Sequence, residues 1–134
     1  MQRAGNAGEQ RLKNKYTLGI GGHIREHDIE GLTIFDWATR EFNEEVYYDG
    51  SLSIQPLGLI NDESNAVGQV HLGFAFLLKG DSGNIRIRSE LQNGSLLPLE
   101  QCASFFDQME TWSQIAFTYL QQDFLRNECG NINQ

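Results

Sequence analysis

Hydrophobic and polar residues alternate with a helical period near the middle of the chain. Between residues 33 and 48, apolar side chains recur at steps of three and four: Phe35, Ala38, Phe42 and Val46. This spacing places them on one face of an α-helix. Thr33 opens a Thr-x-x-Asp pattern, which caps a helix by satisfying free backbone N–H groups, and Asp49-Gly50 is a turn signal. The pattern predicts a helix from Thr33 to about Tyr48.

The segments around this helix have the shorter period of β-strands. Residues 16–20 predict a short strand that enters a turn at Gly21-Gly22. Residues 52–60 and 70–78 predict two strands separated by a polar loop, the second buried on both faces. GDSGN at 80–84 predicts a hairpin turn into residues 85–88, whose strict alternation is typical of a half-buried strand near an edge.

After Pro98 the pattern becomes helical again, and one or two helices are expected. An apolar stripe recurs at steps of three and four along this segment: Cys102, Phe105, Met109, Trp112, Ala116 and Tyr119. Such a stripe packs into a core or seals an interface with another chain. Packing into the core is the favoured interpretation.

Composition narrows the class of protein. The 134 residues, of which 40% are hydrophobic, are enough for one domain over 1–134, with residues 1–14 expected as a Gly-rich flexible arm. The net charge of −8 argues against a nucleic-acid polymer and suits a bound cation. The longest apolar run is far shorter than a membrane span needs. Two widely spaced cysteines indicate neither a disulfide framework nor a zinc clip, and a cytoplasmic setting is expected.

Three glutamates are crowded into about one turn of the predicted helix. Glu41 repels Glu44 at i,i+3 and Glu45 at i,i+4, each pair costing about 0.2–0.5 kcal/mol. They flank the apolar face, where a hard divalent cation would relieve the repulsion by taking carboxylate oxygens. The alternative is a solvated acidic face partly offset by Arg40, which can reach Glu44. The residues alone leave both interpretations open.

The same residues carry a family resemblance. Arg40, Glu41, Phe42, Glu44 and Glu45 resemble the core of the Nudix box, and Gly22 resembles its leading glycine. The runs YTLGIGGHI, GLINDESNAVGQVHLGFAF and METWSQIAF resemble a bacterial and archaeal subgroup of Nudix proteins described as phosphoesterases. The resemblance covers nearly the whole chain.

This resemblance implies an α/β fold, specifically an α/β/α sandwich in which a mixed sheet lies between helices and the box forms loop, helix, loop. It implies a pyrophosphohydrolase that cleaves a diphosphate linkage. Glu41, Glu44 and Glu45 would hold Mg²⁺ or Mn²⁺, and Arg40 would orient a glutamate by a salt bridge. The metal would neutralise the pyrophosphate and activate water.

The box departs from the family pattern at two positions. Asp28 stands where a glutamate is expected, and eleven residues instead of seven separate it from Arg40, because the loop is lengthened around IEGL. Asp28 is therefore expected to be a weaker metal ligand. Tyr47 replaces the glycine after the double glutamate, so the helix is expected to continue to Asp49-Gly50.

Other polar residues offer competing chemistry. HIREH, from His23 to His27, fits the inverted zinc-protease motif H-x-x-E-H, but it follows three glycines and predicts a loop where that chemistry needs a helix. His71 is expected to be a satisfied core residue. Three acids lie in or beside loops that could face the site, as a general base or as plain solvated acids: Asp62, Glu63 and Glu90.

The sequence therefore predicts a metal-dependent Nudix hydrolase acting on a nucleoside diphosphate derivative or a similar small phosphoanhydride. The alternative is a catalytically weak or silent module that binds a nucleotide or another phosphorylated ligand. Residues 1–15 show no strand pattern, so the sheet should lack a strand that the family supplies before the glycine pair. An uncovered sheet promotes pairing with a second chain, and a homodimer is expected, with a self-covered monomer as the alternative.

Overall fold

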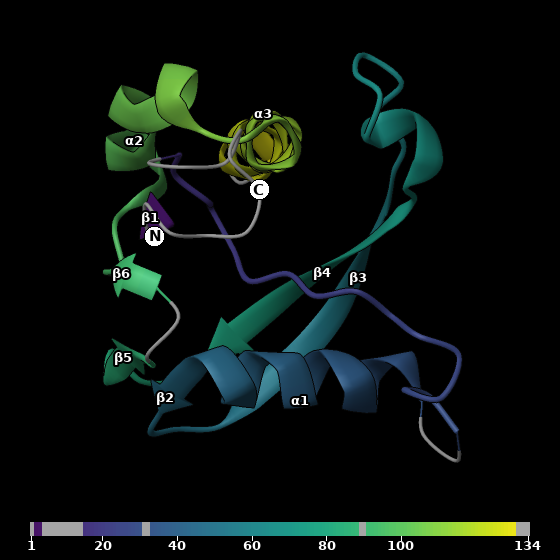
Figure 1. Ribbon diagram of the computed structural model, residues 1–134. Coiled ribbons are helices and arrows are strands. Elements are labelled where there is room, and N and C mark those ends of the chain that lie inside the picture. Colours follow the sequence, from purple (N-terminus) through teal and green to yellow (C-terminus); the bar gives the residue numbers. More distant parts are fainter. Residues whose placement is uncertain (1, 4–14, 31–32, 89–90, 131–134) are drawn as a thin grey trace.

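A ribbon of two long strands connects a lower layer that contains α1 to an upper layer that contains α3 (Figure 1). The computed structural model describes residues 2–3, 15–30, 33–88 and 91–130. The elements are β1 (Gln2–Arg3), α1 (Ile34–Glu45), β2 (Val46–Tyr48), β3 (Leu52–Ile60), η2 (Gly68–Val70), β4 (Gly73–Gly80), β5 (Ile85–Ile87), β6 (Leu91–Asn93), α2 (Leu99–Cys102), η3 (Ala103–Gln108) and α3 (Thr111–Gly130).

Helix α1 begins as predicted and ends earlier. The Thr33 hydroxyl accepts the Asp36 backbone N–H at 3.2 Å, and the Asp36 carboxylate accepts the Thr33 backbone N–H at 2.9 Å, which completes a capping box. The expected continuation to Tyr48 is wrong. Val46 has extended backbone angles, φ −130° and ψ 138°, and starts a strand. The β-branched and aromatic residues that follow Glu45 favour the pleated ladder.

Strand β2 pairs antiparallel with β5, with Val46 opposite Ile87 and Tyr48 opposite Ile85. The strand at 85–88 is confirmed, but the expected hairpin with the preceding strand is wrong, because β5 pairs with β2 and not with β4. The Asp81 carboxylate links the two turns by accepting the Ser51 N–H at 2.7 Å. This hydrogen bond lowers the pKa of Asp81.

Strands β3 and β4 form a long antiparallel hairpin, from Leu52 opposite Gly80 to Ile60 opposite Gly73. The register shifts between Pro56 and Gly58, and Gly58 has φ +150°, a conformation that glycine adopts readily. The prediction that the second strand is buried on both faces is wrong: β4 starts at Gly73, and Phe74 is 53% exposed.

The upper layer packs the C-terminal segment against residues near the start of the described chain. Tyr16 donates its N–H to Gln108 and accepts the N–H of Glu110, both at 3.0 Å, in a parallel bridge beside Met109. The expected strand over 16–20 is reduced to this bridge. Helices after Pro98 are confirmed. Met109 is 4% exposed and Trp112 lies against Gly73, so this part of the apolar stripe packs inside the protein.

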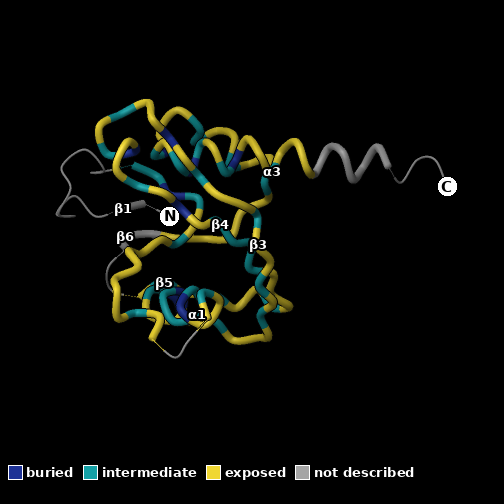
Figure 2. The backbone as a smooth tube through the Cα atoms, turned by 90° about the vertical axis from the view of Figure 1, so that its right-hand side faces the viewer, coloured by how far each residue is buried: buried dark blue, intermediate teal, exposed yellow. Residues whose placement is uncertain are grey.

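The buried apolar residues in the described part of the chain form two groups. Trp37, Phe42 and Val46 belong to α1 and β2, whereas Met109 and Phe117 belong to the upper layer. Figure 2 shows buried segments in both layers, with the exposed and half-buried ribbon between them. The Phe35 ring meets the Phe76 ring edge-on at 5.6 Å, which connects α1 to β4.

The chain has an α/β fold, as predicted. Its described strands pair as three antiparallel two-stranded ladders, so the α/β/α sandwich with one mixed sheet stays a prediction. The expectation that no strand forms near the N-terminus is wrong for Gln2–Arg3, which pair with β6. The rest of the expected arm, residues 4–14, lies outside the described residues. None of the helices in the described part of the chain has the length and apolar character needed to span a membrane.

Candidate active site

Arg40 lies among three carboxylates. Its guanidinium nitrogens lie 3.7 Å from an oxygen of each of Asp28, Glu41 and Glu44. Nη1 also donates to the Asp28 backbone carbonyl at 3.5 Å. The helical spacing brings Glu44 to Arg40 from one turn along α1, as predicted, whereas Asp28 reaches the same guanidinium from the loop before the helix.

These four residues line an open pocket of about 430 Å³, called the acidic pocket here and defined by His23, Arg25, Asp28, Arg40, Glu41 and Glu44. The loop before α1 supplies the first three residues and the C-terminal half of α1 supplies the rest. Asp28 is further fixed by the Arg25 N–H, which donates to its carboxylate at 2.7 Å. Four of the residues singled out in the sequence are thus brought together.

Gly22 lies directly against the Glu41 carboxylate. A Cβ atom at this position would come within 2.8 Å of Glu41 Cδ and closer still to Oε2. Residues other than glycine would therefore push this carboxylate away. The neighbouring Gly21 has open space around the same position. The structural role of Gly22 is to let the backbone approach the Glu41 carboxylate closely.

Glu45 and Glu63 do not line the acidic pocket. Glu45 is the last residue of α1, its side chain is half-buried, and its carbonyl accepts the Arg88 N–H at 2.7 Å. Glu63 is exposed, and its carbonyl accepts the Gln69 side chain at 3.3 Å. Glu90 lies outside the described residues.

Asp62 organises its own loop. It is 8% exposed, and its carboxylate accepts the Ser64 N–H at 3.0 Å and the Asn65 side chain at 3.1 Å. The hydrogen bond from Ser64 lowers the pKa of Asp62. A carboxylate occupied in this way braces the connection between β3 and β4.

The histidines of HIREH diverge, and the motif lies in a loop and turn, as expected. The His27 ring nitrogen lies 3.0 Å from Glu30, away from the acidic pocket. His23 lines the pocket, and its ring meets that of His71 edge-on at 5.6 Å. His71 bonds its Nδ1 to the Val67 carbonyl at 2.7 Å. His23 was not predicted as a pocket residue, although its position next to Gly22 in the sequence indicated it.

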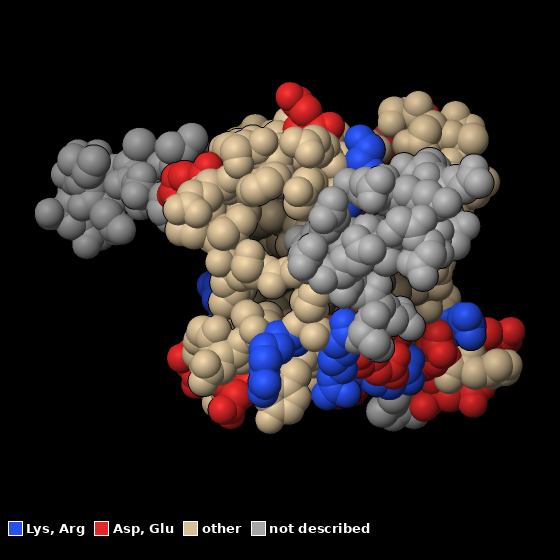
Figure 3. Space-filling view, turned by 60° about the vertical axis from the view of Figure 1, so that its left-hand side comes forward, with Lys and Arg blue, Asp and Glu red and all other residues tan. Residues whose placement is uncertain are grey.

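The donor chemistry of the acidic pocket suits a hard divalent cation, because Asp28, Glu41 and Glu44 all supply carboxylate oxygens and Gly22 leaves Glu41 room. Across the described ranges, however, no three His, Cys, Asp or Glu side chains converge tightly enough to hold a metal ion as they stand. Arg40 neutralises the carboxylates in this arrangement. On the face in Figure 3, acidic and basic side chains mix across the lower part of the molecule, where α1 lies.

Comparison with known proteins finds two similar chains. Protein YmaB of Bacillus subtilis (strain 168) is 33% identical over 131 residues, which cover 90% of this chain and 63% of that protein. The crystal structure of Tm1382, described as "a putative Nudix hydrolase", has 38% sequence identity and a TM-score of 0.58, and the match covers 78% of this chain and 58% of that chain. The chain thus spans less than two thirds of the length of either protein. No family model matches.

Proposed function

Because the chain belongs to the Nudix superfamily, we propose that it is a metal-dependent hydrolase that cleaves a diphosphate linkage in a nucleoside diphosphate derivative or a similar small phosphoanhydride. The observation that carries this proposal is the acidic pocket, where the carboxylates of Asp28, Glu41 and Glu44 surround the Arg40 guanidinium. The backbone of Gly22 lies against the Glu41 carboxylate in the same place.

The proposed cofactor is Mg²⁺ or Mn²⁺. Glu41, Glu44 and Glu45 would hold it, with Asp28 as a weaker ligand, since all four offer the oxygen donors that these ions take. When bound, such an ion neutralises the diphosphate and activates water. Glu41 and Glu45 stand one helical turn apart on α1, the spacing at which two side chains are neighbours on one side of a helix.

Arg40 has a positioning role in this proposal. Its contacts with Glu41 and Glu44, each at 3.7 Å, place a positive charge between these two carboxylates and relieve their mutual repulsion. Its side chain is 39% exposed, so each contact is weak and can be exchanged for a cation at small cost.

The acidic pocket also contains hydrogen-bond donors for phosphate oxygens. Arg25 and His23 line it from the loop, and Glu41 and Glu44 line it from α1. A diphosphate with a divalent cation presents both signs of charge. A pocket with carboxylates on the helix and N–H donors on the loop matches that combination.

A second candidate is a module that binds a nucleotide without cleaving it. It is favoured by the spread of the acidic side chains, which do not form a ready metal site in the described structure. A phosphate-release screen distinguishes the two, run over nucleotide sugars, dinucleoside polyphosphates, nucleoside triphosphates and prenyl diphosphates with and without Mg²⁺. Mg²⁺-dependent release from any of them supports the hydrolase, whereas binding without release under every condition supports the module.

A further inference from the structure

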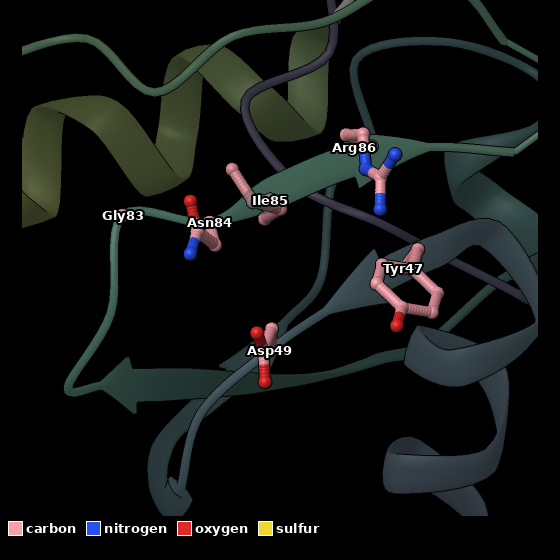
Figure 4. Close-up of a pocket in the computed structure, with 6 residues that line it drawn as sticks. All are labelled: Tyr47, Asp49, Gly83, Asn84, Ile85 and Arg86. Atoms are coloured by element: carbon pink, nitrogen blue, oxygen red, sulfur yellow. The ribbon is translucent and has the colours of Figure 1, made fainter.

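A second pocket lies on the ladder that follows the glutamate helix. Tyr47 on β2 stands directly opposite Arg86 on β5, and the Asp49 N–H donates to the Asn84 carbonyl at 3.1 Å. Side chains two residues apart on a strand share a face. Tyr47, Asp49, Asn84 and Arg86 are therefore expected on one face of the ladder, and they line a pocket of about 290 Å³ with Gly83 and Ile85 (Figure 4). We call these four residues the β2–β5 platform.

One pair of the platform is aromatic and cationic. The Arg86 guanidinium carbon lies 4.8 Å from the centre of the Tyr47 ring, within cation–π distance. Both residues are exposed, Tyr47 at 49%. Arg86 forms no ion pair with any side chain in the described ranges. Its guanidinium thus keeps a flat surface and unused N–H donors.

The other pair supplies hydrogen-bonding groups. Neither the Asp49 carboxylate nor the Asn84 side-chain amide makes a hydrogen bond to another described residue. The hydrogen bonds of these two residues are made by their backbone N–H and C=O groups. The Arg40 guanidinium differs from that of Arg86, since it is already paired with three carboxylates. The platform therefore presents an acceptor and a donor–acceptor amide beside a stacking surface, all unused.

We propose that the β2–β5 platform binds the nucleobase of a nucleotide. A base stacks on arginine planes and aromatic rings, and its edge carries N–H and carbonyl groups that a carboxylate and an amide satisfy. Tyr47 and Arg86 provide the stacking surface, and Asp49 and Asn84 meet the edge. Asp49 accepts hydrogen bonds only, so guanine binds best, because its N1–H and its neighbouring amino group donate side by side to one carboxylate, whereas adenine offers only its amino group.

The platform adjoins the proposed reaction site along the chain. Tyr47 follows Glu44 by three residues, so their Cα atoms are at most about 11 Å apart. This inference rests on the proposed function for the choice of a nucleotide over other planar ligands. It also assigns a role to Tyr47, which replaces the glycine that follows the double glutamate in the Nudix box.

The test is binding of the uncharged nucleosides guanosine and adenosine, and of inorganic phosphate, to ¹⁵N-labelled protein without metal. Guanosine should shift the amide signals of Tyr47, Asp49, Asn84 and Arg86 and bind more tightly than adenosine. Tyr47→Leu and Arg86→Gln should each weaken guanosine binding about tenfold. Arg88→Gln, which makes the same charge change outside the pocket, should leave binding unchanged.

Unshifted platform signals, or guanosine binding unaffected by both substitutions, would overturn the proposal. A response to phosphate alone would also overturn it, because Arg86 would then bind an anion and no base. Absence of hydrolysis for every substrate, with guanosine still bound at the platform, would contradict the proposed function and leave the base site standing.

Discussion

The Arg40 guanidinium lies 3.7 Å from the Glu44 carboxylate, one helical turn further along α1. An exposed pair at this spacing stabilises a helix by only about 0.3–0.5 kcal/mol. Arg40 also contacts Asp28 and Glu41, so one guanidinium interacts weakly with three carboxylates. The crowded glutamates are thus partly neutralised within the chain, and they stay accessible to a divalent ion.

Gly22→Ala is expected to lower turnover by about tenfold or more, because the added methyl group displaces the Glu41 carboxylate and misplaced catalytic groups are costly. Gly21→Ala is the matched control, since open space surrounds its Cβ position. Steady-state hydrolysis of the substrate found by the screen measures both. Equal activities of the two variants would show that the Gly22–Glu41 approach is unimportant.

Asp28→Asn is expected to weaken Mn²⁺ binding less than Glu44→Gln does. Asp28 reaches the acidic pocket from a lengthened loop and has a short side chain, already engaged by the Arg25 N–H and Arg40. Parallel Mn²⁺ titrations of the two variants provide the comparison. A larger loss of affinity for Asp28→Asn would reverse the proposed ranking of ligands.

The capping box predicts how stability depends on pH. The hydrogen bond from the Thr33 side chain, followed by that from its backbone, lowers the pKa of Asp36 in the folded protein. A lowered folded-state pKa adds stability above the unfolded value of about 3.9, and that stability is lost as pH falls through the folded pKa. The melting temperature should therefore drop less steeply below about pH 4 in Asp36→Asn than in the wild type.

Asp49→Asn is the control, because the Asp49 carboxylate accepts no hydrogen bond from the described residues. Its pH profile should match that of the wild type. Some acid sensitivity should persist in Asp36→Asn, since hydrogen bonds also lower the pKa of Asp62 and Asp81. Superimposable profiles for Asp36→Asn and the wild type would show that the capping box does not contribute to the loss of stability in acid.

A homodimer remains our prediction, with the exposed face of the β3–β4 hairpin as its contact. Leu59 and Phe74 are paired in register and are 61% and 53% exposed, which leaves an uncovered apolar patch. Phe74→Gln should convert the dimer to a monomer. Light scattering coupled to size exclusion reports the mass, and a wild-type value near 15.2 kDa that does not rise with concentration would exclude the dimer.

The helix and part of its site could be predicted from the sequence because both depend on local spacing. Thr33 and Asp36 form their cap within one turn, and Arg40 reaches Glu44 along the same helix. The end of α1 could not be fixed in this way. Val46 leaves the helix because it pairs with a strand 41 residues later, where it lies opposite Ile87.

Long-range placement also decided which loop residues share the acidic pocket. His23 and His27 lie in one motif, yet only His23 faces the pocket and meets His71. The turn that separates them is stabilised by Asp28, which accepts the Arg25 N–H. The pairing of β5 with β2 likewise created the β2–β5 platform from two segments with no sequence signal for a shared site.

Turnover of Glu41→Gln in saturating substrate and Mg²⁺ decides whether the acidic pocket is a metal-dependent hydrolytic site. Glu41 lines the acidic pocket, contacts Arg40 and lies against Gly22, so removing its charge should lower turnover by about 100-fold or more while circular dichroism shows an intact fold. Glu63→Gln, an exposed acid outside the pocket, should keep wild-type turnover. Wild-type turnover in Glu41→Gln would contradict the assignment of the acidic pocket as a metal-dependent hydrolytic site.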